Sequence, residues 1–190
     1  MRQSGKGGQA QDEAAPVIEV VRTHLELRGL AALRPGRAPT GNVRLEHYHS
    51  IVRYVYRTIY AKVGGPWRWR DRFIWTDAEI DAYLSSPDVA IWVLAVDDEL
   101  AGYFELQRHS VGHVEIAYFG LVRAFMGRGL GGWLLTRAVE ESFRLGADRV
   151  TLHTCTLDAA AALPNYLARG FVPVREERYF VEDEETTLSS

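Results

Sequence analysis

The sequence has little of what marks a secreted, disulfide-bonded or membrane-spanning protein. Among its 190 residues there is a single cysteine, Cys155. One cysteine excludes a disulfide within the chain and suits a reducing cytoplasm, and a lone cysteine in an apolar stretch is usually a small buried hydrophobic residue. No apolar run approaches the roughly 18 residues that a membrane helix needs, and residues 1–16 have no apolar segment of the kind found in signal peptides. We therefore expect a cytoplasmic protein that does not act at a membrane.

The chain also lacks a large excess of charge of either sign. Its formal net charge is −3, and it has no basic stretch typical of nucleic-acid binding. His47 and His49 have no third partner at a convincing spacing, so we expect no metal. Residues 1–16 predict a disordered segment and residues 183–190 an acidic, polar tail. Residues 17–182 have the length of one domain, and 47% of the chain is hydrophobic.

Hydrophobic periodicity predicts the elements of the first half of the chain. Alternating apolar residues indicate a strand that begins near Val17, and residues 34–42 predict a loop. Apolar residues at helical spacing then predict a helix from Tyr48 to Val63. Thr76 and Glu79 have the spacing of a capping box, which predicts a second, shorter helix that ends before Pro87.

The second half predicts a sheet. The expected order is strand 89–96, strand 100–108, strand 114–122, helix 130–145, strand 150–154, helix 159–169 and strand 171–181. Short turns make the first three strands an antiparallel meander, whereas a helical connection makes the strands 114–122 and 150–154 parallel. The fold class is therefore a single α+β domain with a mixed, mostly antiparallel sheet flanked by helices. An edge strand near the C-terminus would offer a pairing surface for a homodimer.

The strongest chemical signal is a Gly-rich loop at 127–132, between a strand and a helix. Amides at a helix N-terminus lack helical partners, the helix dipole favours an anion there, and glycines leave the backbone accessible. The loop therefore predicts a phosphate site, with a charged contact from Arg128. The expected cofactor-binding residues of the loop are Gly127, Arg128, Gly129, Leu130, Gly131 and Gly132.

A dinucleotide-binding reading of the same loop is an alternative, because Gly127, Gly129 and Gly132 satisfy G-x-G-x-x-G. Three features oppose it. Antiparallel strands precede the motif, four residues separate Val122 from the first glycine, and only 58 residues follow Gly132. A nucleotide-binding oxidoreductase therefore stays the weaker hypothesis. A P-loop is excluded because no Gly-Lys-Ser/Thr follows.

Two motifs resemble those of the GCN5-related N-acetyltransferases. Residues 126–131 match the Gln/Arg-x-x-Gly-x-Gly/Ala signature, except that Met126 replaces the usual Gln or Arg. Residues 162–171 match the Ala-x-x-x-Tyr-x-x-x-Gly-Phe segment, although Ala159, with Asp158 beside it, stands where an Asn is common. The resemblance covers about residues 89–175. It implies acetyl-CoA as co-substrate and transfer of the acetyl group to a primary amine of a small molecule or peptide, by direct attack in a ternary complex.

The resemblance also implies roles for single residues. Tyr166 is expected to serve the departing sulfur, and the strand edge at Phe119, Leu121 and Val122 to hold the pantetheine arm and the oxyanion. Glu115, on the strand that leads to the Gly-rich loop, is expected to take the amine proton, with a pKa raised by burial. A core position for Tyr166 and an exposed one for Glu115 remain the structural alternatives.

The acceptor site is the least defined part of the prediction. Glu105 is a second candidate base on the neighbouring strand, and Tyr56 and Trp67, with Tyr60 and Trp69, are candidates for the acceptor pocket. Aromatic residues at helical spacing belong more often to a core. The sequence does not identify the acceptor, and a non-catalytic acyl-CoA-binding module stays an alternative to an enzyme.

Overall fold

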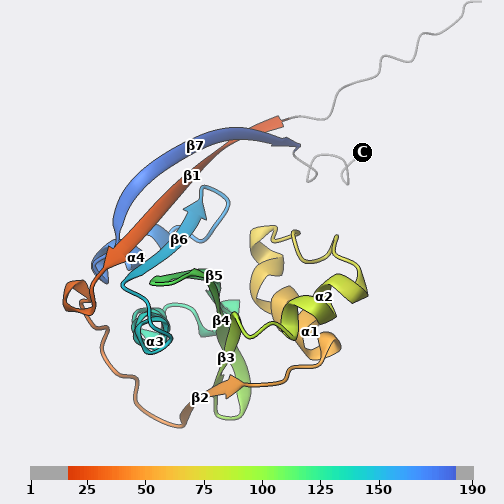
Figure 1. The fold of residues 1–190 in the computed structure, drawn as a ribbon, viewed down its shortest axis with the longest axis horizontal. Helices are drawn as coiled ribbons and strands as arrows, with labels where there is room; N and C mark the ends of the chain where they lie inside the picture. The colour runs from red at the N-terminus through yellow and green to blue at the C-terminus, as the bar shows by residue number, and fades with distance from the viewer. Residues whose placement is uncertain (1–16, 183–190) are drawn as a thin grey trace, which may run out of the picture.

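A computed structural model describes residues 17–182 (Figure 1). The predicted disordered segment at 1–16 and acidic tail at 183–190 lie outside the described residues. The elements are β1 (Val17–Arg28), η1 (Leu30–Ala32), β2 (Val43–Tyr48), α1 (Arg53–Gly64), η2 (Gly65–Trp67), α2 (Asp77–Leu84), β3 (Val89–Val96), β4 (Glu99–Ser110), β5 (His113–Leu121), η3 (Arg123–Phe125), α3 (Leu130–Arg144), β6 (Arg149–Cys155), α4 (Ala162–Ala168) and β7 (Val172–Glu182).

The strands form one mixed sheet in the order β2-β3-β4-β5-β6-β1-β7. Every neighbouring pair is antiparallel except β5 and β6, which are parallel because α3 connects them. The single α+β domain and the parallel pair around the Gly-rich loop are therefore confirmed. β7 is an edge strand, as expected of the C-terminal strand, and it lies far from the other edge, β2.

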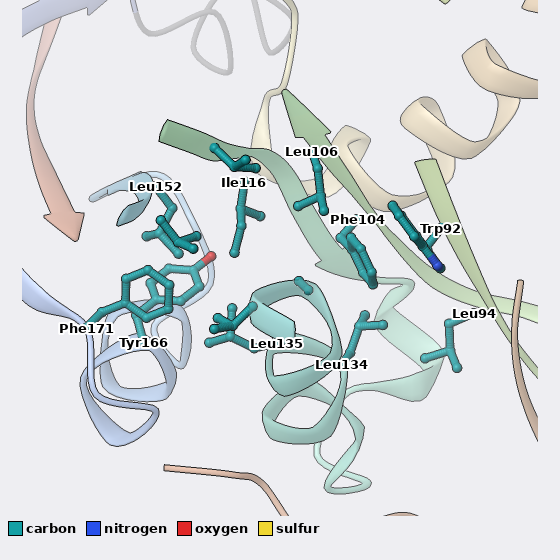
Figure 2. Close-up of a cluster of buried hydrophobic side chains, with 14 of the residues drawn as sticks. Trp92, Leu94, Phe104, Leu106, Ile116, Leu134, Leu135, Leu152, Tyr166 and Phe171 are labelled. Carbon is teal, nitrogen blue, oxygen red and sulfur yellow. The ribbon is translucent and has the colours of Figure 1, made fainter. Parts of the chain in front are cut away.

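Helices cover both faces of the sheet, and the alternating side chains of β4 show why. Tyr103 is fully buried against α1 and α2, where it packs with Tyr56 and Ile80. Phe104 is equally buried on the opposite face, in the larger cluster that includes Leu134 of α3 (Figure 2). Burying one such side chain contributes roughly 1.5–3 kcal/mol, so the two clusters together provide the main stabilisation of the domain.

The capping box is confirmed, and two predicted boundaries are wrong. The Thr76 hydroxyl accepts a bond from the Glu79 N–H, while the Glu79 carboxylate accepts one from the Thr76 N–H. β2 was not expected, and the helix begins at Arg53 rather than Tyr48. β2 is an edge strand with only one half-buried face, so its short alternation is a weak signal. α4 begins at Ala162 rather than 159, because a turn fills the preceding residues.

The N-terminal strand has an unexpected position. β1 lies between β6 and β7 and pairs with both, joining the two ends of the chain in one long ribbon (Figure 1). Leu25 and Leu27 of β1 face the core, so Arg22 and His24 face the opposite side of the sheet. Within residues 17–182, no helix is long and apolar enough to cross a membrane.

Candidate active site

The site begins where two parallel strands separate. The described pairing of β5 with β6 covers three residue pairs and ends where Glu115 meets Thr151. β5 then continues to Leu121 and β6 to Cys155. Ala117 has no partner on β4, where the register shifts, and a bulge of this kind bends its strand and increases the local twist. The two strands therefore diverge and leave a gap in the sheet.

A cavity of about 740 Å³ occupies this gap. The Gly-rich loop, α4, the segment 67–71 and parts of β1 and β7 complete its wall. Phe119 and Tyr166 line it from the side of α3 and α4, whereas Trp69 and Tyr118 line it from the side of α1. The cavity thus passes between the two faces of the sheet, and its volume is typical of a small-molecule site.

The Gly-rich loop brings free backbone amides to the cavity. Gly127 and Gly129 have φ values of +73° and +77°, and an added Cβ at either would meet no atom within 4 Å. Gly129 is the N-cap of α3, no side chain of the described residues caps this helix, and its first turn carries no acidic residue. Unpaired amides, the helix dipole and open space are the features that favour an anion at a helix N-terminus.

The other residues of the loop contribute in different ways. Gly131 and Gly132 line the cavity, and Asn165 of α4 donates to the Gly131 carbonyl at 3.3 Å. The Leu130 side chain belongs to the core, and Leu130 is not among the residues that line the cavity. Arg128 is not among the lining residues, and its guanidinium lies 5.0 Å from the centre of the Phe125 ring.

The free edge of β5 offers hydrogen-bonding groups along the cavity. The Val122 N–H donates to the Ala101 carbonyl at 2.9 Å, so this amide is already paired. Because bonding directions alternate along an antiparallel strand, the N–H groups of Leu121 and Phe119 point away from β4, toward the gap. Phe119 and Leu121 line the cavity, whereas the Val122 side chain packs against both hydrophobic clusters.

Tyr166 lies at the cavity wall rather than wholly inside the core. Its ring packs edge-on against Phe119 and Phe171, with centroid distances of 6.0 and 6.3 Å. Burial, assisted by the nearby Asp158 carboxylate, raises the pKa of the Tyr166 phenol. The hydroxyl is therefore protonated at neutral pH and is a competent hydrogen-bond donor.

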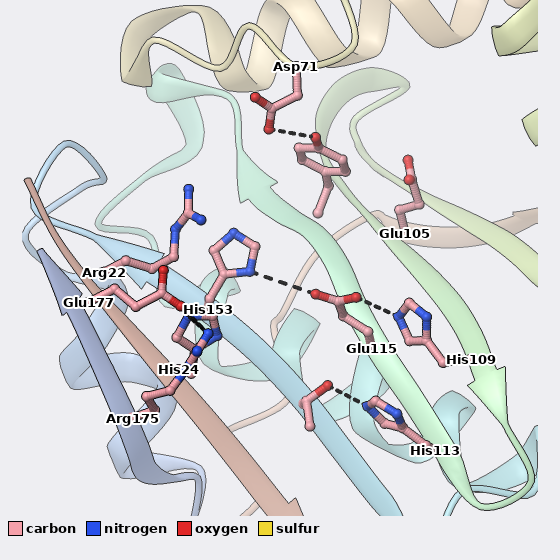
Figure 3. A network of polar contacts seen from close by, with 12 residues as sticks. Arg22, His24, Asp71, Glu105, His109, His113, Glu115, His153, Arg175 and Glu177 are labelled. Carbon is pink, nitrogen blue, oxygen red and sulfur yellow. Dashed lines mark hydrogen bonds and ion pairs between the residues drawn. The ribbon is translucent and has the colours of Figure 1, made fainter. Parts of the chain in front are cut away.

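Glu115 lies at the apex of the gap, but it is not among the cavity-lining residues (Figure 3). Its carboxylate is 3.7 Å from His153 Nδ1 and 2.6 Å from His109 Nε2. These two imidazoles, His153 foremost, outweigh desolvation and lower the Glu115 pKa to about 2. The prediction that burial raises this pKa is wrong, because the sequence did not show the two histidine partners.

The structure places Glu105 and Tyr56 away from the cavity. Glu105 is 0% exposed and accepts hydrogen bonds from the Tyr56 hydroxyl, at 3.0 Å, and from Tyr83. Its counterion is Arg72, whose nitrogen lies at 3.3 Å. Burial raises the Glu105 pKa in spite of this partner. A buried, fully partnered ion pair of this kind specifies local geometry.

The ion pair of Arg72 and Glu105 lies directly after the segment 67–71 and holds its end in place. The Arg72 guanidinium lies 4.9 Å from the ring centre of Tyr118, whose hydroxyl donates to Asp71 at 3.2 Å. Trp67 and Trp69 precede this anchor, and both line the cavity; their role toward an acceptor stays a prediction. The Trp69 indole N–H also donates to Asp158 at 3.4 Å, which connects the segment to the turn after β6. Tyr60 is buried behind Trp69, at a centroid distance of 5.6 Å.

The residues of the cavity wall that sequence analysis missed include Arg22, His153, Tyr179 and Asp158. The Arg22 Nε is buried without a hydrogen-bond partner among the described residues, and another of its nitrogens donates to the Tyr179 hydroxyl at 3.3 Å. The alternation of β1 was a usable signal, since it places Arg22 opposite the core. Nothing local indicated that β1 lies beside β6.

Solved structures share this fold with little sequence identity. A GCN5-related N-acetyltransferase from Kribbella flavida has a TM-score of 0.62 and 18% identity, covering 88% of this chain and 60% of that one. A functionally unknown conserved protein from Staphylococcus epidermidis has a TM-score of 0.62 and 17% identity, covering 86% and 61%. A tandem GNAT protein from the clavulanic acid biosynthesis pathway has a TM-score of 0.61 and 15% identity, covering 90% and 54%. The chain thus spans less than two thirds of each neighbour.

Sequence comparison gives the family. Among curated proteins, none matches the chain significantly. The profile of the acetyltransferase (GNAT) family matches residues 57–171, which is more than half of the chain and includes the Gly-rich loop, Glu115 and Tyr166. β1 and β7 lie outside the matched region. This chain belongs to the acetyltransferase (GNAT) family.

Proposed function

We propose that this protein transfers the acetyl group of acetyl-CoA to a primary amine, by direct attack in a ternary complex. The observation that carries the proposal is one cavity that joins an uncapped, Gly-rich helix N-terminus to the diverging ends of two parallel strands. Family membership supports acyl transfer in general. The particular donor, acceptor and mechanism are inferred from the chemistry of the cavity wall.

Three features of the wall support coenzyme A as the donor. The first-turn amides of α3 suit its pyrophosphate, and the open space at Gly127 and Gly129 leaves room for close approach. The unpaired edge of β5 suits the amide groups of the pantetheine arm, which would add to the sheet like a further strand. At the end of that edge, the Leu121 N–H would stabilise the oxyanion that forms on the thioester carbonyl.

The acceptor amine would enter from the other face, between Trp69 and Tyr118 on one side and Arg22 on the other. An amine with a pKa near 10 is protonated at neutral pH and must lose a proton before it attacks. Its nitrogen then bonds to the carbonyl carbon, and the C–S bond breaks with its electron pair on sulfur. Tyr166 donates its proton to the thiolate and regains one that the nitrogen loses as the amide forms.

Two alternative functions are consistent with the same loop. A non-catalytic acyl-CoA-binding module would use the same loop and strand edge, and a nucleotide-binding oxidoreductase would use the loop as a dinucleotide site. Titration calorimetry with coenzyme A and with NADH tests the oxidoreductase alternative. We expect coenzyme A to bind and NADH not to bind, whereas an oxidoreductase would bind NADH.

A thiol-release assay with acetyl-CoA then separates the enzyme from the binding module. The amine panel should include polycationic, zwitterionic and acidic acceptors, since Arg22 and Asp71 give the acceptor side charges of both signs. Release of coenzyme A that depends on one acceptor class, with acetylated product seen by mass spectrometry, supports the proposal. Binding of coenzyme A without transfer to any amine contradicts it.

A further inference from the structure

His153 occupies a position that Glu115 was expected to fill. It lies on β6 two residues beyond the last pair with β5, at the apex of the gap, and it lines the cavity. Its neighbours in sequence, Leu152 and Thr154, face the core, so its side chain lies on the acceptor face of the sheet. Tyr166 lines the same cavity from the opposite face. The two residues flank the place where thioester and amine would meet.

Glu115 orients this imidazole. Its carboxylate lies 3.7 Å from His153 Nδ1, an ion-pair distance, and the other ring nitrogen points away from Glu115 (Figure 3). His109 holds the second carboxylate oxygen at 2.6 Å. Among residues 17–182, no three side chains of His, Cys, Asp or Glu converge as metal ligands would.

We propose that His153 is the base that accepts the proton of the acceptor amine, and that Glu115 is a positioning residue which holds the imidazole and stabilises its charged form. This inference rests on the proposed acetyl transfer. The ammonium proton moves to Nε2 of His153, the free amine attacks the thioester, and the imidazolium releases the proton to solvent after turnover. The single proton that the overall reaction liberates therefore leaves through His153.

The proton affinities of the two groups support this assignment of roles. A carboxylate with a pKa of about 2 is a weak base at neutral pH. Imidazole is the side chain whose ordinary pKa lies nearest to neutral pH, which suits a general base. The groups that face His153 are Glu115 from β5 and, from β1, His24 at a ring-centroid distance of 5.7 Å and Arg22 of the cavity wall. The Glu177 carboxylate of β7 lies 2.8 Å from His24, and Glu115 is the anion in direct ion-pair contact with His153.

The decisive kinetic variant is His153→Gln, which keeps a polar side chain but cannot accept the proton. We expect coenzyme A affinity to persist, kcat/KM to fall by about 10²–10⁴-fold, and the acidic limb of the pH profile to disappear. Added imidazole should restore part of the activity of His153→Ala. The matched control is His113→Gln, on β5, whose ring contacts Thr151 at 2.8 Å outside the cavity; its activity should equal that of the wild type.

Glu115→Gln tests the positioning role with a different readout. Loss of the carboxylate removes the ion pair that stabilises the imidazolium, so the acidic limb of the pH profile should move to lower pH. A limb that stays in place in Glu115→Gln overturns the positioning role. An active wild type whose His153→Gln variant is equally active overturns the base while leaving acetyl transfer intact. A wild type that binds coenzyme A but acetylates no amine overturns the proposed function and, with it, this inference.

Discussion

The two sides of the cavity are built on different principles. The side that we propose for the donor consists mainly of backbone: the amides of the Gly-rich loop at the start of α3 and the unpaired edge of β5. The side that we propose for the acceptor consists of side chains from the segment 67–71, β1, β6 and β7. A backbone site requires a short local pattern, which a sequence displays directly. A side-chain site requires several distant segments to meet, which it does not display.

The two sides also differ in how they are supported. The donor side follows the strand, turn and helix geometry of one continuous segment, 113–144. The acceptor side depends on the buried pair of Arg72 and Glu105, which anchors the segment 67–71 behind Tyr118. Damage to the first should therefore affect donor binding alone, whereas damage to the second should affect the stability of the fold as well.

Gly129→Glu should have the largest effect of the variants considered, a loss of coenzyme A binding at the donor side. A carboxylate at the first turn of α3 repels a phosphate and fills the open space, and loss of two charged hydrogen bonds alone costs more than about 100-fold in affinity. Calorimetry should detect no coenzyme A binding. Gly146→Glu is the control, because it also places a side chain at positive φ, +91°, but at the other end of α3. Equal affinities in the two variants would contradict the donor assignment.

Arg72→Met should destabilise the acceptor side, because it removes the ion pair that anchors the segment 67–71. It leaves Glu105 buried and uncompensated, which costs about 3–5 kcal/mol in the free energy of unfolding. Urea denaturation measures the loss. Because burial raises the Glu105 pKa, the loss should become smaller as the pH falls and the carboxyl takes up a proton.

The control for this prediction is Arg137→Met on α3. Arg137 forms ion pairs with Glu140 and Glu141 while 31% of its side chain remains exposed. Removing such a surface contact should cost about 1 kcal/mol or less. Similar losses in the two variants would show that the pair of Arg72 and Glu105 does not support the acceptor side.

Tyr166→Phe tests a residue that lies between the donor side and the acceptor side, and it should change turnover without changing stability. The ring still packs against Phe119 and Phe171, so the melting temperature should change little. Loss of one positioned proton donor should slow turnover by roughly 10–10³-fold without weakening coenzyme A binding. Single-turnover kinetics measure the step. Full activity would show that solvent protonates the thiolate.

Glu115→Gln predicts a loss of stability that depends on pH. The Glu115 pKa is lowered from 4.5 to about 2, so the carboxylate stabilises the native state above about pH 4.5 and loses this contribution as the pH falls toward 2. The contribution is roughly 3 kcal/mol at most. Urea denaturation of wild type and variant between pH 7 and pH 3 should show a difference that shrinks in acid. A constant difference would contradict the lowered pKa.

Sequence patterns determined most of the elements and the position of the Gly-rich loop. Glycines at a strand-to-helix junction specify where amides are free, and the spacing of Tyr166 to Phe171 places a phenol on a helix near that junction. These features are local, because each follows from the conformational preferences of neighbouring residues. β2 escaped prediction since a half-buried edge strand shows only a weak alternation.

The tertiary structure alone decided the chemistry of the acceptor side. Only the placement of β1 beside β6 brings Arg22 to the cavity, and only the approach of His109 and His153 lowers the Glu115 pKa rather than raising it. A pKa depends on the charges and the solvent within a few ångströms, and pairing between distant strands depends on how the whole core packs. Neither quantity is contained in the spacing of residues along the chain.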